Sequence, residues 1–175
     1  MIDPAKGVQV FAGIGGNLGD PAHTLTAAVL RIERDSGVRV VAASPVYRNP
    51  PVGPQDQPDY LNAVIELEVT LSPQDLHSRF LAVEKEFGRV RKTRWGPRTL
   101  DLDILTYGDR IVDEPGLTIP HPHMHERSFV LVPLADLHPH AVHPLLNRSY
   151  CDMAEQVGRE GLDRVDVFLV SAKPG

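Results

Sequence analysis

The feature that most constrains the fold is an alternation of apolar and acidic residues in the middle of the chain. After the break at Gly96-Pro97, the segment 100–104 has apolar residues at its even positions and Asp101 and Asp103 between them. A period of two is typical of a β-strand with one buried face, because successive side chains point to opposite sides. Both carboxylates therefore lie on one face of the predicted strand. Like charges at this spacing repel each other unless a cation lies between them, and oxygen ligands of this kind suit Mg²⁺.

A run of basic residues comes directly before the two aspartates. Its members are Arg89, Arg91, Lys92, Arg94 and Arg98. An isolated Asp-x-Asp is most often a solvated sheet face, and this interpretation stays open for the acidic pair alone. Together with the basic run, the pair predicts a site for a metal-bound nucleotide phosphate. In such sites Mg²⁺ bridges phosphate oxygens, and guanidinium groups neutralise the remaining charge.

Composition indicates an ordinary globular protein around this site. The 175 residues, with 23% charged residues and a net charge of −5, fit one domain over 1–175. Because the basic run stands against an acidic background, a local anion site is favoured over nucleic-acid binding. No apolar run is long enough to span a membrane, the first residues lack a signal-peptide core, and the single Cys151 fits a reducing compartment. We expect a cytoplasmic protein with neither nucleic-acid nor membrane partners.

The order of the predicted elements indicates an α+β fold. Strands are expected over 8–14, 38–46, 59–68 and 100–104, and helices from 20 to about 37 and from 72 to 87. This order, strand-helix-strand-strand-helix-strand, predicts a ferredoxin-like sandwich with a mostly antiparallel sheet and helices packed on its faces. After a turn at 107–110, a short hairpin partner is expected at 111–112. A buried helix is expected over 129–137, a solvated polar loop over 138–144, a helix over 150–157 and a final strand over 165–170.

Two further stretches carry candidate binding residues. The loop 49–58 holds four prolines and a glycine, so it is stiff and suits the wall of a binding site. A linker is the alternative, and the unchanged composition beyond the loop argues against it. In the next strand Tyr60 and Asn62 share a face and can hold a flat heterocycle by stacking and hydrogen bonds, although residue type alone does not decide this.

The histidines at 121, 123 and 125 alternate in a way that suggests zinc. Pro122 interrupts them, and no cysteine completes a tetrahedral set, so a transition-metal site is disfavoured. His121 and Arg127 can instead meet a phosphate. The glycine-rich loop 15–20 lacks the Lys-Ser/Thr ending of a P-loop, and a structural turn is the favoured interpretation there.

Taken together, these segments resemble the 6-hydroxymethyl-7,8-dihydropterin pyrophosphokinase family of folate biosynthesis. The likeness runs from about residue 8 to 137. It rests on YRNPPVGPQDQPDYLN at 47–62, GRVR at 88–91, RWGPRTLDLDI at 94–104 and PHP at 120–122, together with Arg127. The resemblance implies ATP-dependent transfer of a pyrophosphoryl group to the hydroxymethyl oxygen of a reduced pterin, with release of AMP. ATP is then a co-substrate, two Mg²⁺ ions are the cofactor, and a monomer is expected.

The resemblance also implies roles for individual residues. Asp101 and Asp103 match the Mg²⁺ ligands. The positions that match pterin-binding residues are Pro50, Val52, Tyr60, Asn62, Trp95 and Phe129. The positions that match ATP-binding residues are Lys92, Arg94, Arg98, Ile104, Thr118, His121 and Arg127. Arg89 and Arg98 join the two aspartates as catalytic residues, and Arg89 and Trp95 match mobile loops that close over the substrates.

The chain departs from the family pattern in three places. Gly16 stands where many relatives have serine, Pro122 replaces an aromatic residue of certain members, and the loop between Lys92 and Arg94 is one residue shorter than in some. None of these changes a matched metal ligand or a residue of the pterin clamp. Two other classes stay open: an RNA-binding module on the same fold, and a catalytically inactive pterin- or nucleotide-binding protein. The aspartate pair argues against both.

Overall fold

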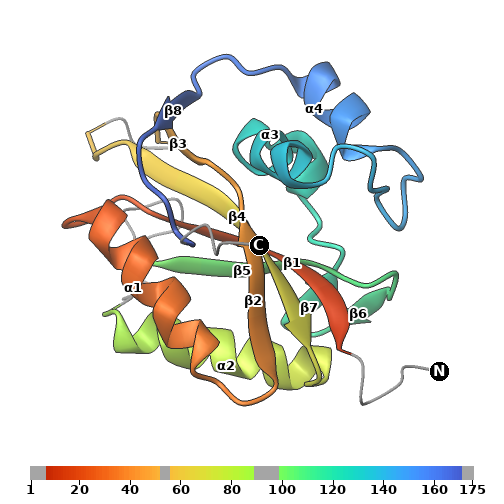
Figure 1. Cartoon of the computed structure of the whole chain (residues 1–175). Helices are drawn as coiled ribbons and strands as arrows, with labels where there is room; N and C mark the ends of the chain where they lie inside the picture. The colour runs from red at the N-terminus through yellow and green to blue at the C-terminus, as the bar shows by residue number, and fades with distance from the viewer. Residues whose placement is uncertain (1–6, 52–55, 89–98, 171–175) are drawn as a thin grey trace, which may run out of the picture.

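The computed structural model describes residues 7–51, 56–88 and 99–170, which fold around one large sheet (Figure 1). The strands of this sheet are β1 (Val8–Gly16), β2 (Val38–Ala43), β3 (Val46–Asn49), β4 (Tyr60–Val69), β5 (Asp101–Tyr107) and β8 (Asp163–Val165). Their order is β5-β1-β4-β3-β8, with β2 also paired to β4, and each of these pairs is antiparallel. This arrangement confirms the predicted ferredoxin-like α+β sandwich.

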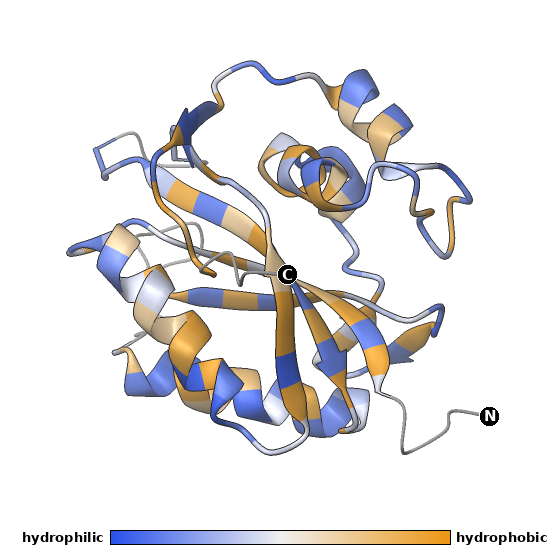
Figure 2. Ribbon diagram, viewed as in Figure 1, coloured by the Kyte–Doolittle hydropathy of each residue, from blue (hydrophilic) through white to orange (hydrophobic). Residues whose placement is uncertain are grey.

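Helices cover both faces of the sheet (Figure 1). α1 (Pro21–Glu33) and α2 (Pro73–Glu86) pack on one face, and α3 (Ser128–Leu137) and α4 (Tyr150–Val157) pack on the other. The strands accordingly alternate between two hydrophobic cores: Val10 and Ala12 face α1 and α2, whereas Phe11 between them faces α3 and α4. Figure 2 shows hydrophobic residues along the strands and helices that meet in these cores. In the part of the chain that the structure describes, no helix is long and apolar enough to cross a membrane.

The first two helices begin at the capping residues that the sequence predicts. The Asp20 carboxylate accepts a hydrogen bond of 3.2 Å from the His23 backbone N–H, and Pro21 follows at the first helical position. Ser72 caps α2 in the same way through the Asp75 N–H at 3.1 Å. Such caps satisfy donors that the first turn of a helix leaves unpaired.

The strand expected over 38–46 is in fact two strands. Ser44 interrupts it by exchanging two bonds with Val64: its N–H donates to the Val64 carbonyl at 2.8 Å, and its Oγ accepts from the Val64 N–H at 2.9 Å. Pro45, which has no N–H to continue the ladder, follows directly. The break lets β2 and β3 pair with different parts of β4.

Two other predicted strands are also corrected. The hairpin partner expected at 111–112 belongs instead to a separate two-stranded sheet, in which β6 (Val112–Glu114) pairs with β7 (Leu117–Ile119). The final strand was predicted over 165–170, but β8 ends at Val165. Its partner β3 is short, and Leu169 instead joins the core between the sheet and the first two helices.

The loop over 138–144 is more than a solvated connection. His143 is buried, and its Nδ1 accepts hydrogen bonds from the backbone N–H groups of Leu145 and Leu146, each 3.1 Å long. His138 Nε2 lies 2.9 Å from a carboxylate oxygen of Glu66, a buried residue of β4. The prediction of a solvated loop was therefore wrong for His143, which is buried, whereas His138 is partly exposed and is held by its contact with Glu66.

Candidate active site

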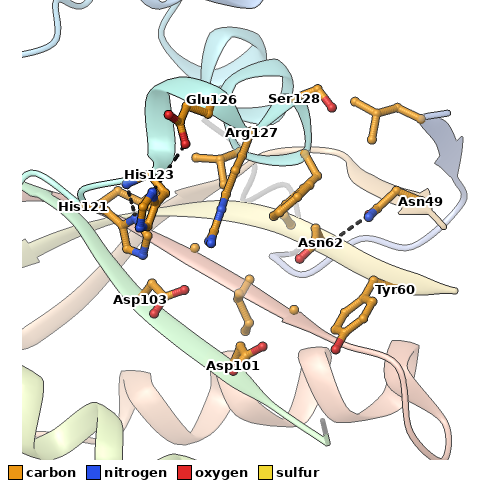
Figure 3. Close-up of a pocket in the computed structure, with 18 of the residues that line it drawn as sticks. Asn49, Tyr60, Asn62, Asp101, Asp103, His121, His123, Glu126, Arg127 and Ser128 are labelled. Carbon is orange, nitrogen blue, oxygen red and sulfur yellow. Dashed lines mark hydrogen bonds and ion pairs between the residues drawn. The ribbon is translucent and has the colours of Figure 1, made fainter. Parts of the chain in front are cut away.

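A cavity of about 740 Å³ opens on the α3 side of the sheet (Figure 3). Its floor is formed by β1, β4 and β5, and its walls come from the segments 121–130 and 160–162. Figure 3 shows Asn49, Tyr60 and Asn62 at one end, His121 and His123 at the other, and the two aspartates between the ends. The cavity therefore has an aromatic and amide end, an imidazole end and an acidic floor.

Glycines of the central strand keep this floor open. In the register of the sheet, Gly13 lies opposite Asp103, and Gly15 lies between Asp101 on one side and Asn62 on the other. A Cβ atom at Gly15 would lie 2.2 Å from Asn62 Oδ1, far inside the contact distance. A side chain at Gly15 would therefore displace the Asn62 amide.

A pair of amides orders the aromatic end. Asn62 Nδ2 donates to Asn49 Oδ1 at 2.7 Å, and Asn49 Nδ2 donates to the Pro50 carbonyl at 3.1 Å (Figure 3). Asn49 is buried, so these bonds fix its position. The orientation of the Asn62 amide in the cavity is fixed in turn, beside Tyr60 on the same face of β4.

His121 and Arg127 are among the side chains at the opposite end, with His123 and Glu126 beside them. His121 Nδ1 accepts a hydrogen bond of 3.1 Å from the His123 N–H, so a neutral His121 carries its proton on Nε2. Burial lowers the pKa of His121 to about 4, with smaller contributions from the charges of Arg127 and His123. The Arg127 guanidinium lies 5.7 Å from the centre of the Phe129 ring. At neutral pH this end presents an imidazole N–H donor and a guanidinium cation, which together suit an anion.

The cavity brings together eight of the residues that the sequence analysis selected. They are Pro50, Tyr60, Asn62, Asp101, Asp103, His121, Arg127 and Phe129. Two others do not line it. The side chain of Ile104 is buried in the core on the opposite face, as the alternation along β5 requires, and Thr118 is exposed on β7. The remaining predicted residues, Val52, Arg89, Lys92, Arg94, Trp95 and Arg98, lie outside the described residues.

The two aspartates of the cavity floor suit a metal ion that binds together with a substrate. Among residues 7–51, 56–88 and 99–170, no group of three or more His, Cys, Asp or Glu side chains is placed to hold a metal ion. Asp101 and Asp103 supply two carboxylates from adjacent same-face positions of β5. Mg²⁺ is commonly bound by one or two carboxylates, with substrate phosphates and water completing the octahedron. The donor set therefore suits Mg²⁺ together with a polyphosphate.

Several residues that line the cavity were missed by the sequence analysis. They include Gly13, Gly15, Asn49, His123, Glu126, Ser128, Glu160, Gly161 and Leu162. The two glycines had a local signal, because they alternate within an otherwise apolar strand and so share one of its faces. Asn49 is the first residue of the predicted binding loop. Residues 160–162 gave no signal, since contacts with the distant strand β3 bring them to the site.

The fold and the cavity define a class of protein: an α+β domain with a carboxylate floor, one end that suits an anion and another end that suits a flat polar ring. Comparison with known proteins specifies the family. The family model described as 7,8-dihydro-6-hydroxymethylpterin-pyrophosphokinase (HPPK) matches residues 11–139. The chain belongs to this family.

Relatives with assigned names agree with this placement. The chain is 50% identical over 131 residues to 2-amino-4-hydroxy-6-hydroxymethyldihydropteridine pyrophosphokinase of Pseudomonas aeruginosa, covering 75% of this chain and 81% of that protein. The protein of the same name from Synechocystis is 46% identical, covering 83% of this chain and 74% of its relative. The solved structure of Plasmodium falciparum HPPK-DHPS wild type with pteroate matches with a TM-score of 0.70 and 13% identity. It covers 90% of this chain and 45% of that longer one, and at this identity it supports the fold alone.

Proposed function

We propose that the protein transfers pyrophosphate from ATP to the hydroxymethyl group of 6-hydroxymethyl-7,8-dihydropterin and releases AMP, as a step of folate biosynthesis. The main support is that one cavity of a chain in this family combines the Asp101 and Asp103 carboxylates with the Tyr60 and Asn62 side chains. The first pair suits a metal-bound polyphosphate, and the second suits a flat heterocycle.

The pterin is proposed to bind at the aromatic end. Tyr60 and Phe129 are assigned to the two faces of the ring and Asn62 to its edge, because an amide offers both a donor and an acceptor to a heterocycle. Support comes from the cavity, to which all three side chains contribute, and from the Asn49 bond that orients Asn62. Pro50 lines the same end, and the assignments of Val52 and Trp95 rest on the family resemblance alone.

The triphosphate is proposed to lie between the aspartate floor and the imidazole end. Arg127 supplies positive charge there, and the His121 Nε2–H donates to a phosphate oxygen. Asp101 and Asp103 would hold two Mg²⁺ ions, which when bound offset charge on the reacting phosphates. Arg89, Lys92, Arg94 and Arg98 complete the proposed set on the basis of the resemblance alone.

Two details of the residue assignment follow from the geometry. Ile104 contributes to adenine binding only through its backbone, because its side chain is buried on the far face of β5. His121 acts as a hydrogen-bond donor rather than a general base, because its Nδ1 already accepts a bond and its pKa lies near 4. Thr118 remains an assignment from the resemblance, outside the cavity lining.

The decisive experiment is turnover by the purified full chain. With ATP, Mg²⁺ and the hydroxymethyl pterin, AMP and the pyrophosphorylated pterin should form in equal amounts. Asp103→Asn should lower the rate by several orders of magnitude without changing Tm, because the amide removes a charged metal ligand and keeps the shape. Asp109→Asn is the matched control, since Asp109 is an exposed residue just beyond β5 and does not line the cavity.

The outcomes separate the two parts of the proposal. If the wild-type protein makes no AMP across a range of pH and divalent metals, the proposed reaction is wrong. If the wild type turns over and Asp103→Asn keeps a near-normal rate, the reaction stands and the metal assignment fails.

We also propose a cytoplasmic monomer whose partners are the small molecules ATP and the pterin, without nucleic acid. Light scattering at assay concentration, with and without both substrates, tests the oligomeric state.

A further inference from the structure

A tight turn near the end of the chain reaches the cavity from outside the segment that matches the family model. The Leu162 N–H donates to the Arg159 carbonyl at 3.1 Å, which closes a four-residue turn, and Gly161 at its third position has a φ of 81°. This conformation favours glycine, as in a type II turn. Glu160, Gly161 and Leu162 line the cavity, whereas the Arg159 side chain does not. We call this segment the 159–162 turn.

The Arg159 side chain connects the turn to the sheet through contacts with Tyr47 of β3. Its Nη2 donates to the Tyr47 hydroxyl at 3.1 Å, and its guanidinium lies 5.9 Å from the centre of the Tyr47 ring. The Tyr47 hydroxyl in turn donates to Asp136 of α3. Burial, and then the bond to Asp136, raise the pKa of Tyr47, so the phenol keeps the proton that it donates.

Strand pairing holds the other side of the turn. Directly after it, β8 pairs with β3, with Asp163 opposite Arg48 and Arg164 opposite Tyr47. β3 and β8 lie side by side in Figure 1. The turn is therefore fixed by one side-chain cluster and one ladder, and both involve Tyr47.

The turn lies at the end of the cavity assigned to the pterin. A Cβ atom on Gly161 would be 3.6 Å from Pro50 Cδ, an ordinary contact distance, so the turn backbone packs next to Pro50. Tyr47 lies opposite Asn62 in the pairing of β3 with β4. Asn49, also in β3, accepts the Asn62 hydrogen bond. These contacts all belong to the aromatic end, across the cavity from His121 (Figure 3).

We propose that the 159–162 turn is a wall of the pterin subsite, with Leu162 contacting the heterocycle and Arg159 acting as a positioning residue through Tyr47. Tyr60 and Phe129 are assigned to the two faces of the ring, so its edge needs another contact. The half-buried Leu162 side chain supplies apolar cover for that edge. This inference rests on the proposed function, because it assigns a substrate to one end of the site. It predicts that changes in the turn affect pterin recognition and leave the phosphate chemistry alone.

The test compares Michaelis constants for the two substrates in the full-length protein. Leu162→Ala and Arg159→Ala should each raise the KM for the pterin about tenfold, the scale of a lost apolar contact in a pocket. The kcat and the KM for ATP should stay within about twofold of wild type. Arg148→Ala is the matched control, because Arg148 also belongs to the C-terminal part of the chain but bonds to Gln156 away from the cavity. It should change none of the three constants.

A second set of variants tests the positioning role. Tyr47→Phe removes the hydroxyl that receives the Arg159 bond, so it should raise the pterin KM as Arg159→Ala does. The double variant should be no worse than the more affected single variant, because both act through one contact. Arg159→Lys, which keeps a donor for the hydroxyl, should restore part of the pterin affinity.

The outcomes distinguish this inference from the proposed function. If Phe129→Ala raises the pterin KM and neither Leu162→Ala nor Arg159→Ala does, the turn is no part of the subsite, while the proposed function stands. If the turn variants lower Tm and change kcat and both KM values together, the turn is only structural and the inference fails. A wild-type protein without turnover would overturn the proposed function and this inference with it.

Discussion

Adding one methyl group at Gly15 tests the geometry of the site without relying on its function. The Cβ atom of alanine would lie 2.2 Å from Asn62 Oδ1 and 3.0 Å from the Leu61 carbonyl oxygen. The carbonyl belongs to the β4 ladder and does not move freely, so the Asn62 side chain has to give way. Its 2.7 Å bond to Asn49 is then lost. Gly13→Ala is the matched control, because the atoms nearest to its Cβ would belong to Leu105, at 3.6 Å or more.

The expected loss of stability follows from three contributions. Leaving the buried Asn49 oxygen without its donor costs about 1 to 3 kcal/mol. Crowding a packed site costs a further 1 to 3 kcal/mol or so. Replacing glycine stiffens the unfolded chain and returns about 0.4 to 1 kcal/mol. The net destabilisation of Gly15→Ala is therefore about 3 kcal/mol, or a fall in Tm of roughly 10 °C for a chain of this size. Gly13→Ala should keep its stability or gain slightly.

Thermal unfolding and urea titration of both variants give the comparison directly. The double variant Gly15→Ala with Asn62→Ala should be less destabilised than the sum of the single variants, because removing the amide also removes the clash. Equal Tm values for Gly15→Ala and Gly13→Ala would refute the reasoning. Such a result would mean that Asn62 does not lie over Gly15, or that the bond between Asn62 and Asn49 contributes nothing to stability.

Two other substitutions test opposite ends of the cavity. Phe129→Ala should weaken pterin binding by about 1 to 3 kcal/mol, the scale of aromatic stacking on a base, and leave ATP affinity unchanged in calorimetry; equal losses for both ligands would indicate a damaged core. His121 has a pKa lowered by burial to about 4, so its contribution to stability is present above about pH 6.5 and is lost as the pH falls toward 4. His121→Gln should reduce the loss of unfolding free energy between pH 6.5 and pH 4 by up to about 3 kcal/mol, measured by urea titration at several pH values. An unchanged pH profile would contradict the burial of a neutral imidazole.

The parts of the fold that the sequence predicts are those specified by local signals. The alternation around Asp101 and Asp103 marks a strand because neighbouring side chains must face opposite ways, and β5 has this arrangement. Asp20 and Ser72 mark helix starts because each side chain caps its own first turn. None of these inferences needs knowledge of a distant partner.

The parts that could not be predicted depend on partners far along the chain. His138 lies against Glu66, 72 residues earlier, so its sequence neighbours do not reveal that it is held. Arg159 reaches Tyr47 across 112 positions. The apolar run after 165 resembles a strand, but a strand needs a free edge of matching length, and β3 pairs only three of its residues with β8. Long-range pairing decides such segments, and periodicity does not encode it.

The order of the strands relates these distant contacts to the proposed reaction. β5 carries the aspartates at one edge of the sheet, β1 and β4 form the middle of the cavity floor, and β3 with β8 forms the other edge. Three strand spacings of about 4.8 Å separate β5 from β3, so the ends proposed to bind phosphate and pterin stand on different strands. The family model matches up to residue 139, whereas the turn at the far edge begins at 159. We therefore expect substitutions at that edge to change recognition of the pterin without disturbing the carboxylates, because two intervening strands separate the edge from Asp101 and Asp103.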